Sequence, residues 1–264
     1  MLGVFDSGVG GLTVVRALQK ALPDIAMTYL GDTARFPYGS KSAQTIQRFS
    51  RENVEWLLAR GANVIVVACH TASSVAADML RLEYQSRGVP VFDVVGPGLD
   101  EALSVTHGHI GIIGTRGTVA SGAHAQYLKK KSPETDVNVQ ACPLLAPLVE
   151  EGLVNAPETR SILERYLAPL IDLGIDTLVL GCTHYPPLRP LIEELLPEGV
   201  RVIDPADATA AYVQTQLAAL GLLDRLSGEG RLEVFLSDVS PALDTLGPIL
   251  FGHKLTASVA ENAA

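Results

Sequence analysis

Two short apolar runs that each end at a cysteine constrain the fold of this chain more than any other feature. The run VIVVA (64–68) precedes Cys69, and the run TLVLG (177–181) precedes Cys182. Uninterrupted branched runs of this length are typical of buried parallel strands, and small polar residues typically follow at the carboxyl end of such a strand. Open α/β sheets bind ligands at that edge. The pattern therefore predicts two parallel strands that carry two thiols to ligand-binding positions.

Strands and helices are predicted to alternate along the chain, which is typical of parallel sheets covered by helices. The expected strands are Gly3–Phe5, Met27–Leu30, Val64–Ala68, His109–Ile113 and Leu232–Leu236, and the expected helices include Leu12–Ala21, Ala43–Arg60 and Ala206–Leu220. The pattern restarts near His109, and the stretch from Gly111 to Cys182 is nearly as long as that from Gly3 to Cys69. This repeat predicts two similar lobes whose cysteines occupy corresponding positions.

The predicted fold class is therefore α/β, with two similar lobes, each a mostly parallel sheet flanked by helices, and an active site in the cleft between them. The glycine and proline residues at Val95–Gly98 predict a boundary there. We expect residues 1–95 plus 206–264 to form the first lobe and residues 96–205 the second. The small and polar residues of the tail, Thr256–Ala264, predict disorder.

Composition excludes several classes of protein. The chain has 264 residues, which suits two lobes of about 100–150 residues each. No apolar run approaches the roughly 18 residues of a membrane-spanning helix, so no membrane association is expected. A net charge of -9 argues against nucleic-acid binding, and the basic run Lys129–Lys131 is interpreted as a solvated helix end. Three cysteines and the lack of a signal-like start predict a reduced, cytoplasmic protein with free thiols.

The settings of the two cysteines predict acid–base chemistry. Only a few per cent of a free cysteine is ionised at neutral pH, and a helix N-terminus or a polar neighbour increases that fraction. Cys69 precedes a predicted helix that opens at Thr71, and Cys182 has His184 two residues later. Two thiols that face one cleft could remove and return a proton on opposite faces of a substrate, which predicts a racemase. Cys142 has no polar neighbours and is interpreted as buried filler.

Two polar loops follow the first two predicted strands. The segment Asp6–Gly11 places a carboxylate and the Ser7 hydroxyl at the ligand edge, although either side chain could instead cap the next helix. Its glycine spacing does not match the dinucleotide fingerprint. The loop Gly31–Ser40 is rich in functional groups, with an ordinary connecting loop as the alternative.

The motifs FDSGVGGLTV, LGDTARFPYGSKS, VVACHTASS, ACPLLAPLVEEG and LGCTHYP together closely resemble those of glutamate racemases. These are cofactor-independent enzymes that supply D-glutamate for peptidoglycan. The resemblance extends from Gly3 to about Asp207, and the combination of motifs distinguishes this family from its aspartate and hydantoin racemase relatives. Members are commonly dimers, so a homodimer is expected.

The resemblance implies a two-base mechanism with glutamate as the small-molecule substrate and with neither metal nor cofactor. Cys69 would deprotonate D-glutamate and Cys182 would deprotonate L-glutamate, and each thiol would protonate the opposite face. Asp6 and His184 would assist the two thiols. The substrate-binding residues implied are Asp6, Ser7, Tyr38, Gly39, His70, Thr71, Thr183 and His184.

One residue departs from the family pattern, because His70 stands where asparagine usually follows the first cysteine. A neutral histidine offers one donor and one acceptor on a bulkier ring. The ring could contact the substrate, lower the pKa of Cys69 if it is charged, or turn out of the cleft.

Several other functions fit parts of the sequence. The enzyme could racemise another amino acid, such as aspartate. A zinc site of Cys69, His70, Cys182 and His184 has suitable ligand types, but adjacent residues can hardly both point inward. A redox thiol pair lacks the CxxC motif, and a two-lobed binding module would not need matched thiols. Pyridoxal phosphate is disfavoured because Lys41 is the one lysine in the polar loops at the strand ends.

Overall fold

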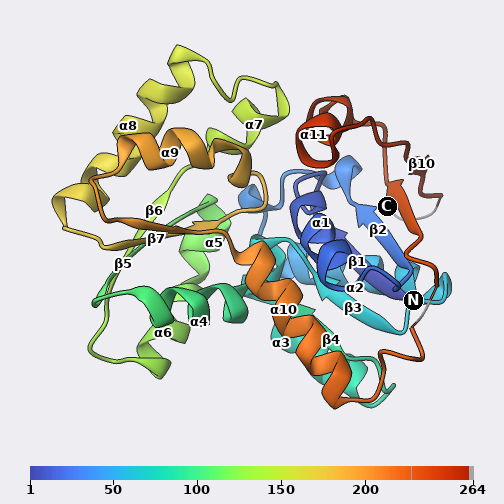
Figure 1. Ribbon diagram of the computed structural model, residues 1–264. Coiled ribbons are helices and arrows are strands. Elements are labelled where there is room, and N and C mark those ends of the chain that lie inside the picture. Colours follow the sequence, from blue (N-terminus) through green and yellow to red (C-terminus); the bar gives the residue numbers. More distant parts are fainter. Residues whose placement is uncertain (227, 262–264) are drawn as a thin grey trace.

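Two parallel sheets, each covered by helices, make up the molecule (Figure 1). The computed structural model describes residues 1–226 and 228–261. The first sheet has the strand order β10-β9-β2-β1-β3-β4, and the second has the order β6-β5-β7-β8. Every strand pair in both sheets is parallel. The predicted α/β fold class with two parallel sheets is confirmed.

The strands of the first sheet are β1 (Leu2–Asp6), β2 (Met27–Gly31), β3 (Val64–Val67), β4 (Val91–Asp93), β9 (Leu232–Leu236) and β10 (Ser258–Val259). Those of the second sheet are β5 (His109–Gly114), β6 (Asp136–Ala141), β7 (Thr177–Gly181) and β8 (Arg201–Ile203). Because β2-β1-β3-β4 and β6-β5-β7-β8 have the same order, β3 and β7 occupy corresponding positions, each beside the central strand. The predicted repeat is therefore present, and Cys69 and Cys182 follow equivalent strands.

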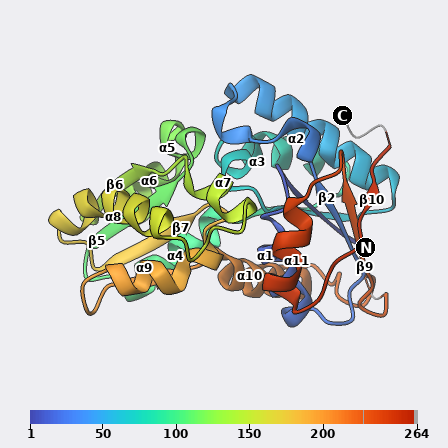
Figure 2. The ribbon, with the colours of Figure 1, turned by 90° about the horizontal axis from the view of Figure 1, so that it is seen from above.

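We call the first sheet with helices α1 (Leu12–Ala21), α2 (Ala43–Ala59), α3 (His70–Gln85) and α11 (Ala242–Phe251) the first lobe. The second lobe is the second sheet with helices α4 (Val95–Val105), α5 (Arg116–Ser121), α6 (Ala123–Lys131), α7 (Leu145–Glu150), α8 (Pro157–Asp172) and α9 (Arg189–Leu195). Helix α10 (Pro205–Ala219) packs on both α1 and α4 and lies between the lobes (Figures 1 and 2). The residue boundaries expected for the two lobes stay a prediction.

The apolar runs of the sequence are the buried strands. Every residue of β1, β2, β3 and β7 is buried, because helices cover both faces of the sheets. Local signals set the helix starts: the Ser42 side chain accepts a hydrogen bond from the backbone of Thr45 at the start of α2, and Asp204 caps α10 just before Pro205. Both helices therefore begin where their sequences predict.

The glycine and proline residues expected to mark a boundary lie in the first turn of α4, the helix with which the second lobe begins after β4. Proline is tolerated there because the first backbone N–H groups of a helix have no partner within it. A Cβ on Gly98 would lie 2.5 Å from the Cβ of Pro205. The glycine therefore serves the close approach of α4 to α10, and its presence is a packing signal rather than a loop signal.

The tail expected to be disordered is ordered where the structure describes it. Residues 258–259 form β10, which pairs with β9, and Ala260 is buried. The indole of Trp56 donates to the backbone oxygen of Glu261 over 3.1 Å. Edge pairing and this hydrogen bond override a composition typical of disorder, while residues 262–264 lie outside the described part. The basic run at residues 129–131 ends helix α6, as predicted. No helix of residues 1–226 and 228–261 is long and apolar enough to cross a membrane.

Candidate active site

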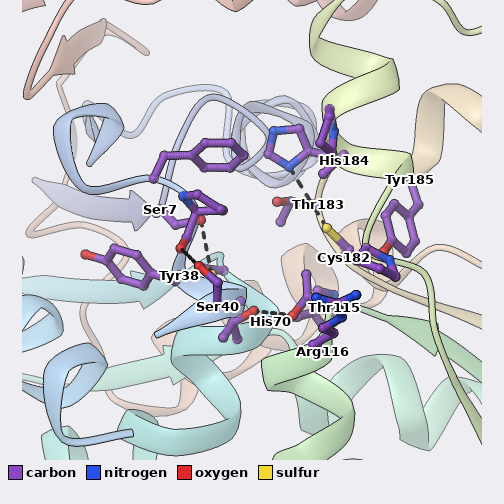
Figure 3. A pocket seen from close by; sticks show the side chains of 18 residues that line it. Ser7, Tyr38, Ser40, His70, Thr115, Arg116, Cys182, Thr183, His184 and Tyr185 are labelled. Carbon is purple, nitrogen blue, oxygen red and sulfur yellow. Dashed lines mark hydrogen bonds between the residues drawn. The ribbon is translucent and has the colours of Figure 1, made fainter. Parts of the chain in front are cut away.

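A cavity of about 200 Å³ lies between the two lobes, at the carboxyl ends of their strands (Figure 3). It is smaller than the roughly 300–1,000 Å³ of pockets for drug-sized ligands, so it suits a small molecule. Loops after β1, β2, β3, β5, β6 and β7 contribute to it. Its lining residues are Ser7, Phe36, Pro37, Tyr38, Gly39, Ser40, Cys69, His70, Thr71, Thr115, Arg116, Pro143, Ala146, Pro147, Cys182, Thr183, His184 and Tyr185. All the predicted site residues except Asp6 line this cavity.

Cys69 is the N-cap residue of α3, and its thiol is enclosed by polar groups. Its Sγ accepts from the backbone N–H of Ala72 over 3.4 Å and lies 3.6 Å from the hydroxyl oxygen of Ser7. Burial and, next, the charge of Asp6 raise the pKa of Cys69 to about 12, while the hydrogen bonds with Ala72 and Ser7 lower it. The backbone N–H at the helix N-terminus therefore lowers this pKa as expected, but desolvation is the larger effect and the net change is upward.

Cys182 lies next to an ion pair. The Nδ1 atom of His184 is 4.0 Å from Sγ of Cys182, and its Nε2 atom is 2.8 Å from Oε1 of Glu150 at the end of α7. Burial alone would lower the pKa of His184, but hydrogen bonds and charge interactions with Cys182 and Glu150 raise it to about 10. His184 is therefore a buried imidazolium at neutral pH.

Asp6 lies behind the cavity wall and connects the lobes. Its carboxylate accepts from the backbone N–H of Gly8 over 2.9 Å and from the hydroxyl of Thr183, in the second lobe, over 3.2 Å. Burial raises the pKa of Asp6, against the opposing charge of His184 and these hydrogen bonds. The alternative that Asp6 or Ser7 caps α1 is wrong, since α1 has no side-chain cap.

The glycine turn before α1 allows the catalytic candidates to approach one another. A Cβ on Gly10 would lie 2.4 Å from Nδ1 of His184 and 2.6 Å from Oγ1 of Thr183. The space that a side chain would occupy is thus filled by the second lobe. The glycines of this motif serve close contact with the residues beside Cys182.

The Tyr38 hydroxyl is engaged outside the cavity. It donates to the buried carboxylate of Asp32 and accepts from Nδ2 of Asn53 over 3.1 Å, and Figure 3 shows it directed away from Cys182. Burial and Asp32 raise the pKa of Tyr38. Asp32 also accepts from Ser237 over 3.0 Å, so it ties the loop after β2 to the end of β9. Any contact of Tyr38 with a substrate would come from its backbone or ring.

Threonine hydroxyls join the lobes at the cavity. Oγ1 of Thr71 lies 2.9 Å from Oγ1 of Thr115 and 3.1 Å from that of Thr118, both in the second lobe. A Cβ on Gly39 would lie 2.7 Å from the Cβ of Thr115. Arg116 is the one arginine or lysine among the lining residues that the structure describes, and it is exposed.

His70 contacts a second buried histidine, His124 of α6. The Nδ1 atom of His70 lies 3.3 Å from Nε2 of His124, and the rings stack with centroids 5.6 Å apart. Burial and the neighbouring ring hold the pKa of His70 well below its usual range. The hypothesis that a charged His70 lowers the pKa of Cys69 is therefore wrong.

The remaining thiol is structural. Cys142 is buried, and its backbone oxygen accepts from the hydroxyl of Tyr185 over 2.8 Å. All three cysteines are free. Within the described part of the chain, no three His, Cys, Asp or Glu side chains are grouped so as to hold a metal ion.

Sequence reasoning missed Glu150, Asp32, Asn53 and His124 as parts of this site. Glu150 belongs to a motif that carries the family resemblance, which could have identified it. Asp32 lies in the same quoted motif as its partner Tyr38, so that motif could have identified it too. No sequence signal pairs Asn53 or His124 with its partner, because those contacts join separate segments of the chain.

The chain is similar to known racemases over almost its whole length. A model of the family described as Asp/Glu/Hydantoin racemase matches residues 10–213. The glutamate racemase of Geobacter metallireducens is 44% identical over 255 residues, which cover 96% of this chain and 93% of the relative. Glutamate racemase isoform RacE1 from Bacillus anthracis superposes with a TM-score of 0.89 at 34% identity, covering 98% of this chain and 96% of the other. The Francisella tularensis glutamate racemase, solved in complex with D-glutamate, gives 0.88 at 31% identity, with 98% and 97% covered.

Proposed function

Because this chain belongs to the Asp/Glu/Hydantoin racemase family, we propose that it is an isomerase that interconverts L- and D-glutamate without a cofactor. The observation that carries the proposal is that two thiols, from equivalent strand ends of a repeated unit, line one small cavity. A racemase needs a proton acceptor and a proton donor on opposite faces of the substrate carbon. The relatives named above act on glutamate, which sets the substrate.

The reaction requires one C–H bond to break and one to form. The thiolate of Cys182 takes the α-proton of L-glutamate and becomes a thiol, and the electron pair stays on the α-carbon, delocalised into the carboxylate. The thiol of Cys69 then donates its proton to the opposite face, giving D-glutamate and leaving a thiolate. The reverse reaction exchanges the roles of the two cysteines, and no other reactant is consumed.

The neighbours of the two thiols suit these roles unequally. The pKa of Cys69 is raised to about 12, so this group holds its proton, as a donor to the substrate should. The imidazolium of His184 would balance the negative charge of a thiolate at Cys182 during proton removal from L-glutamate. The ammonium group of a bound substrate would offset the charge of Asp6 when Cys69 acts as the base.

Hydroxyl and backbone groups at the cavity are suited to hold the ends of the substrate. We propose that Ser7, Thr71 and Thr183, together with the turn at Tyr38 and Gly39, bind the amino and carboxylate groups. The other substrate-binding residues that we propose lie near the two thiols and are Asp6, His70 and His184. Charge stabilisation of this kind is needed because proton removal adds charge beside a carboxylate that is already negative.

The physiological role that we propose is the supply of D-glutamate for peptidoglycan synthesis by a cytoplasmic homodimer. We also propose that residues 1–95 plus 206–264 and residues 96–205 are the two units that close on the substrate. Sedimentation analysis of the purified protein tests the dimer directly.

The test of the activity is incubation of the purified protein with L-glutamate, and separately with D-glutamate, in heavy water. Loss of optical activity from both enantiomers, with deuterium in the product, is the expected result. Cys69→Ser and Cys182→Ser should each lower racemisation at least about 100-fold, the usual contribution of a positioned acid or base. Cys142→Ser is the matched control and should retain activity. Racemisation that survives either of the first two substitutions, or no α-exchange by the unmodified protein, would disprove the two-thiol mechanism.

A further inference from the structure

A pair of buried histidines joins the two lobes beside the cavity. His70 opens α3 in the first lobe and His124 lies in α6 of the second, and their side chains are 4% and 3% exposed. One hydrogen bond, between Nδ1 of His70 and Nε2 of His124, links the stacked rings. The interplanar angle of 24° and the burial of both residues fix the relative orientation of the rings. Each ring therefore faces the other with one defined nitrogen atom.

The second nitrogen of His124 identifies which ring is the donor. Nδ1 of His124 is buried and has no hydrogen-bond partner among the described residues. His124 lines a small pocket of about 20 Å³ in which Thr118 is the one other polar side chain that the structure describes, so a water molecule there would find few of the two to four polar partners it requires. A buried N–H without a partner is rarer than a buried acceptor without one. We therefore assign the proton of His124 to Nε2, from the pattern of hydrogen bonds.

This assignment determines the state of His70. Nε2–H of His124 donates to Nδ1 of His70, so Nδ1 of His70 has no proton, and the proton of that ring is on Nε2. Nε2 of His70 makes no hydrogen bond within the described residues and is not among their buried unpartnered atoms. His70 is also one of the residues that line the cavity (Figure 3). The remaining N–H is thus available to a molecule bound there.

We propose that His124 is a positioning residue that fixes the tautomer of His70, so that His70 presents a neutral N–H donor to a carboxylate of the substrate. This inference rests on the proposed function for the identity of the ligand. A carboxylate oxygen accepts such a bond, whereas the substrate ammonium cannot. Because the two rings belong to different lobes, the donor is fixed only when the lobes are together.

The first test is the tautomer of His70 in the free enzyme, measured by NMR with ¹⁵N-labelled imidazole rings. The signals of His70 are assigned by their loss in His70→Asn. We expect a protonated Nε2 and an unprotonated Nδ1, and a mixture of tautomers in His124→Phe. A protonated Nδ1 in the unmodified enzyme, or a spectrum unchanged by His124→Phe, would overturn the proposal. This measurement does not depend on activity, so it decides the role of His124 even if glutamate is not the substrate.

The second test separates positioning from general stability. His124→Phe keeps a ring but removes the donor, so only the fraction of His70 that still has its proton on Nε2 can bind the carboxylate. We expect KM for glutamate to rise by the reciprocal of that fraction, about two-fold for an equal mixture of tautomers, in both directions and with kcat unchanged. His124→Gln restores an N–H donor and should recover most of the affinity. In a His70→Asn background the amide donor does not depend on a partner ring, so His124→Phe should change KM little further.

The surface variant His253→Phe is the matched control and should leave both constants unchanged. Three outcomes would contradict a role of His124 in setting the tautomer of His70. These are a fall in kcat without a rise in KM in His124→Phe, no recovery in His124→Gln, and an equal effect of His124→Phe with His70 and with Asn at that position. Absence of racemisation by the unmodified enzyme would instead reject the proposed function.

Discussion

Replacing Glu150 with Gln should lower the stability of the protein at neutral pH and leave it nearly unchanged at alkaline pH. The substitution keeps the shape of the side chain and removes the charge that faces His184 over 2.8 Å. His184 is 3% exposed at its side chain and Glu150 is 20% exposed, so solvent screens this pair weakly. The imidazolium would lose its counter-charge, so the pKa of His184 would fall.

The magnitude follows from the pKa of His184, which is about 10 in the folded protein and 6.5 for a histidine side chain without these neighbours, as in the unfolded chain. A folded pKa above the unfolded value stabilises the protein fully below about pH 6.5, and this contribution is lost as the pH rises through about 10. A pH of about 7.5 lies about 2.5 units below the folded pKa. At about 1.4 kcal/mol per unit, protonation of His184 therefore contributes about 3 kcal/mol to the free energy of unfolding at that pH. Because Cys182 shares in the effect, we expect Glu150→Gln to lower the free energy of unfolding by about 1–2 kcal/mol.

Urea unfolding at about pH 7.5 and about pH 10 measures this difference, with Glu151→Gln as the exposed control beside it. The loss in Glu150→Gln should shrink below about 0.5 kcal/mol at the higher pH. In the L-to-D direction, kcat should fall up to about 10-fold, because His184 loses the carboxylate that holds it beside Cys182. A stability loss that is independent of pH, or one that grows towards pH 10, would refute the assignment of a charged His184.

Three further outcomes are expected. Gly10→Ala should lower kcat at least about 10-fold, because its Cβ would meet the His184 ring at 2.4 Å in a packed site; steady-state kinetics and a melting curve distinguish this from unfolding. Gly39→Ala should raise KM for glutamate several-fold, since a Cβ 2.7 Å from that of Thr115 separates the lobes; unchanged KM would show that the contact yields. Cys69 should react with iodoacetamide at about pH 8 more slowly than a free thiol, because its pKa is about 12. Mass spectrometry of the labelled peptide measures the rate, and labelling as fast as that of a free thiol would contradict the raised pKa.

The sequence predicts the sheets well because their signal is local. Strands that are buried on both faces must be apolar throughout, so β3 and β7 are visible as runs that end at the two cysteines. The error at the tail arises because a distant contact overrides composition: β10 pairs with β9, and no local pattern signals this pairing. The close contact of Gly98 with Pro205 is equally invisible in the sequence, because the two residues lie far apart along the chain.

The sequence predicts which residues gather at the cavity better than it predicts their pKa values. The motifs bring nine of the ten expected residues to one cavity, with Asp6 just behind it. They do not give the depth of burial, which outweighs the expected effect of the helix N-terminus on the pKa of Cys69. They contain Glu150 but do not show that it faces His184, and they do not contain His124, which contacts His70 from the other lobe. Desolvation and contacts between lobes arise only in the folded chain. A motif therefore predicts them only when the structure of a relative with that motif is known.

The repeat makes the two thiols equivalent in topology, and the residues around them make them unequal in charge. The carboxylate of Asp6 lies near Cys69, where it and burial raise the pKa of the thiol, whereas the imidazolium of His184 lies beside Cys182. A two-base mechanism gains from unequal settings, because two thiols could not remove a proton and two thiolates could not return one. The hydrogen bond from Thr183 to Asp6 runs between the two sides. The two unequal settings thus meet in one cavity, and the neutral His70 adds no charge that would equalise them.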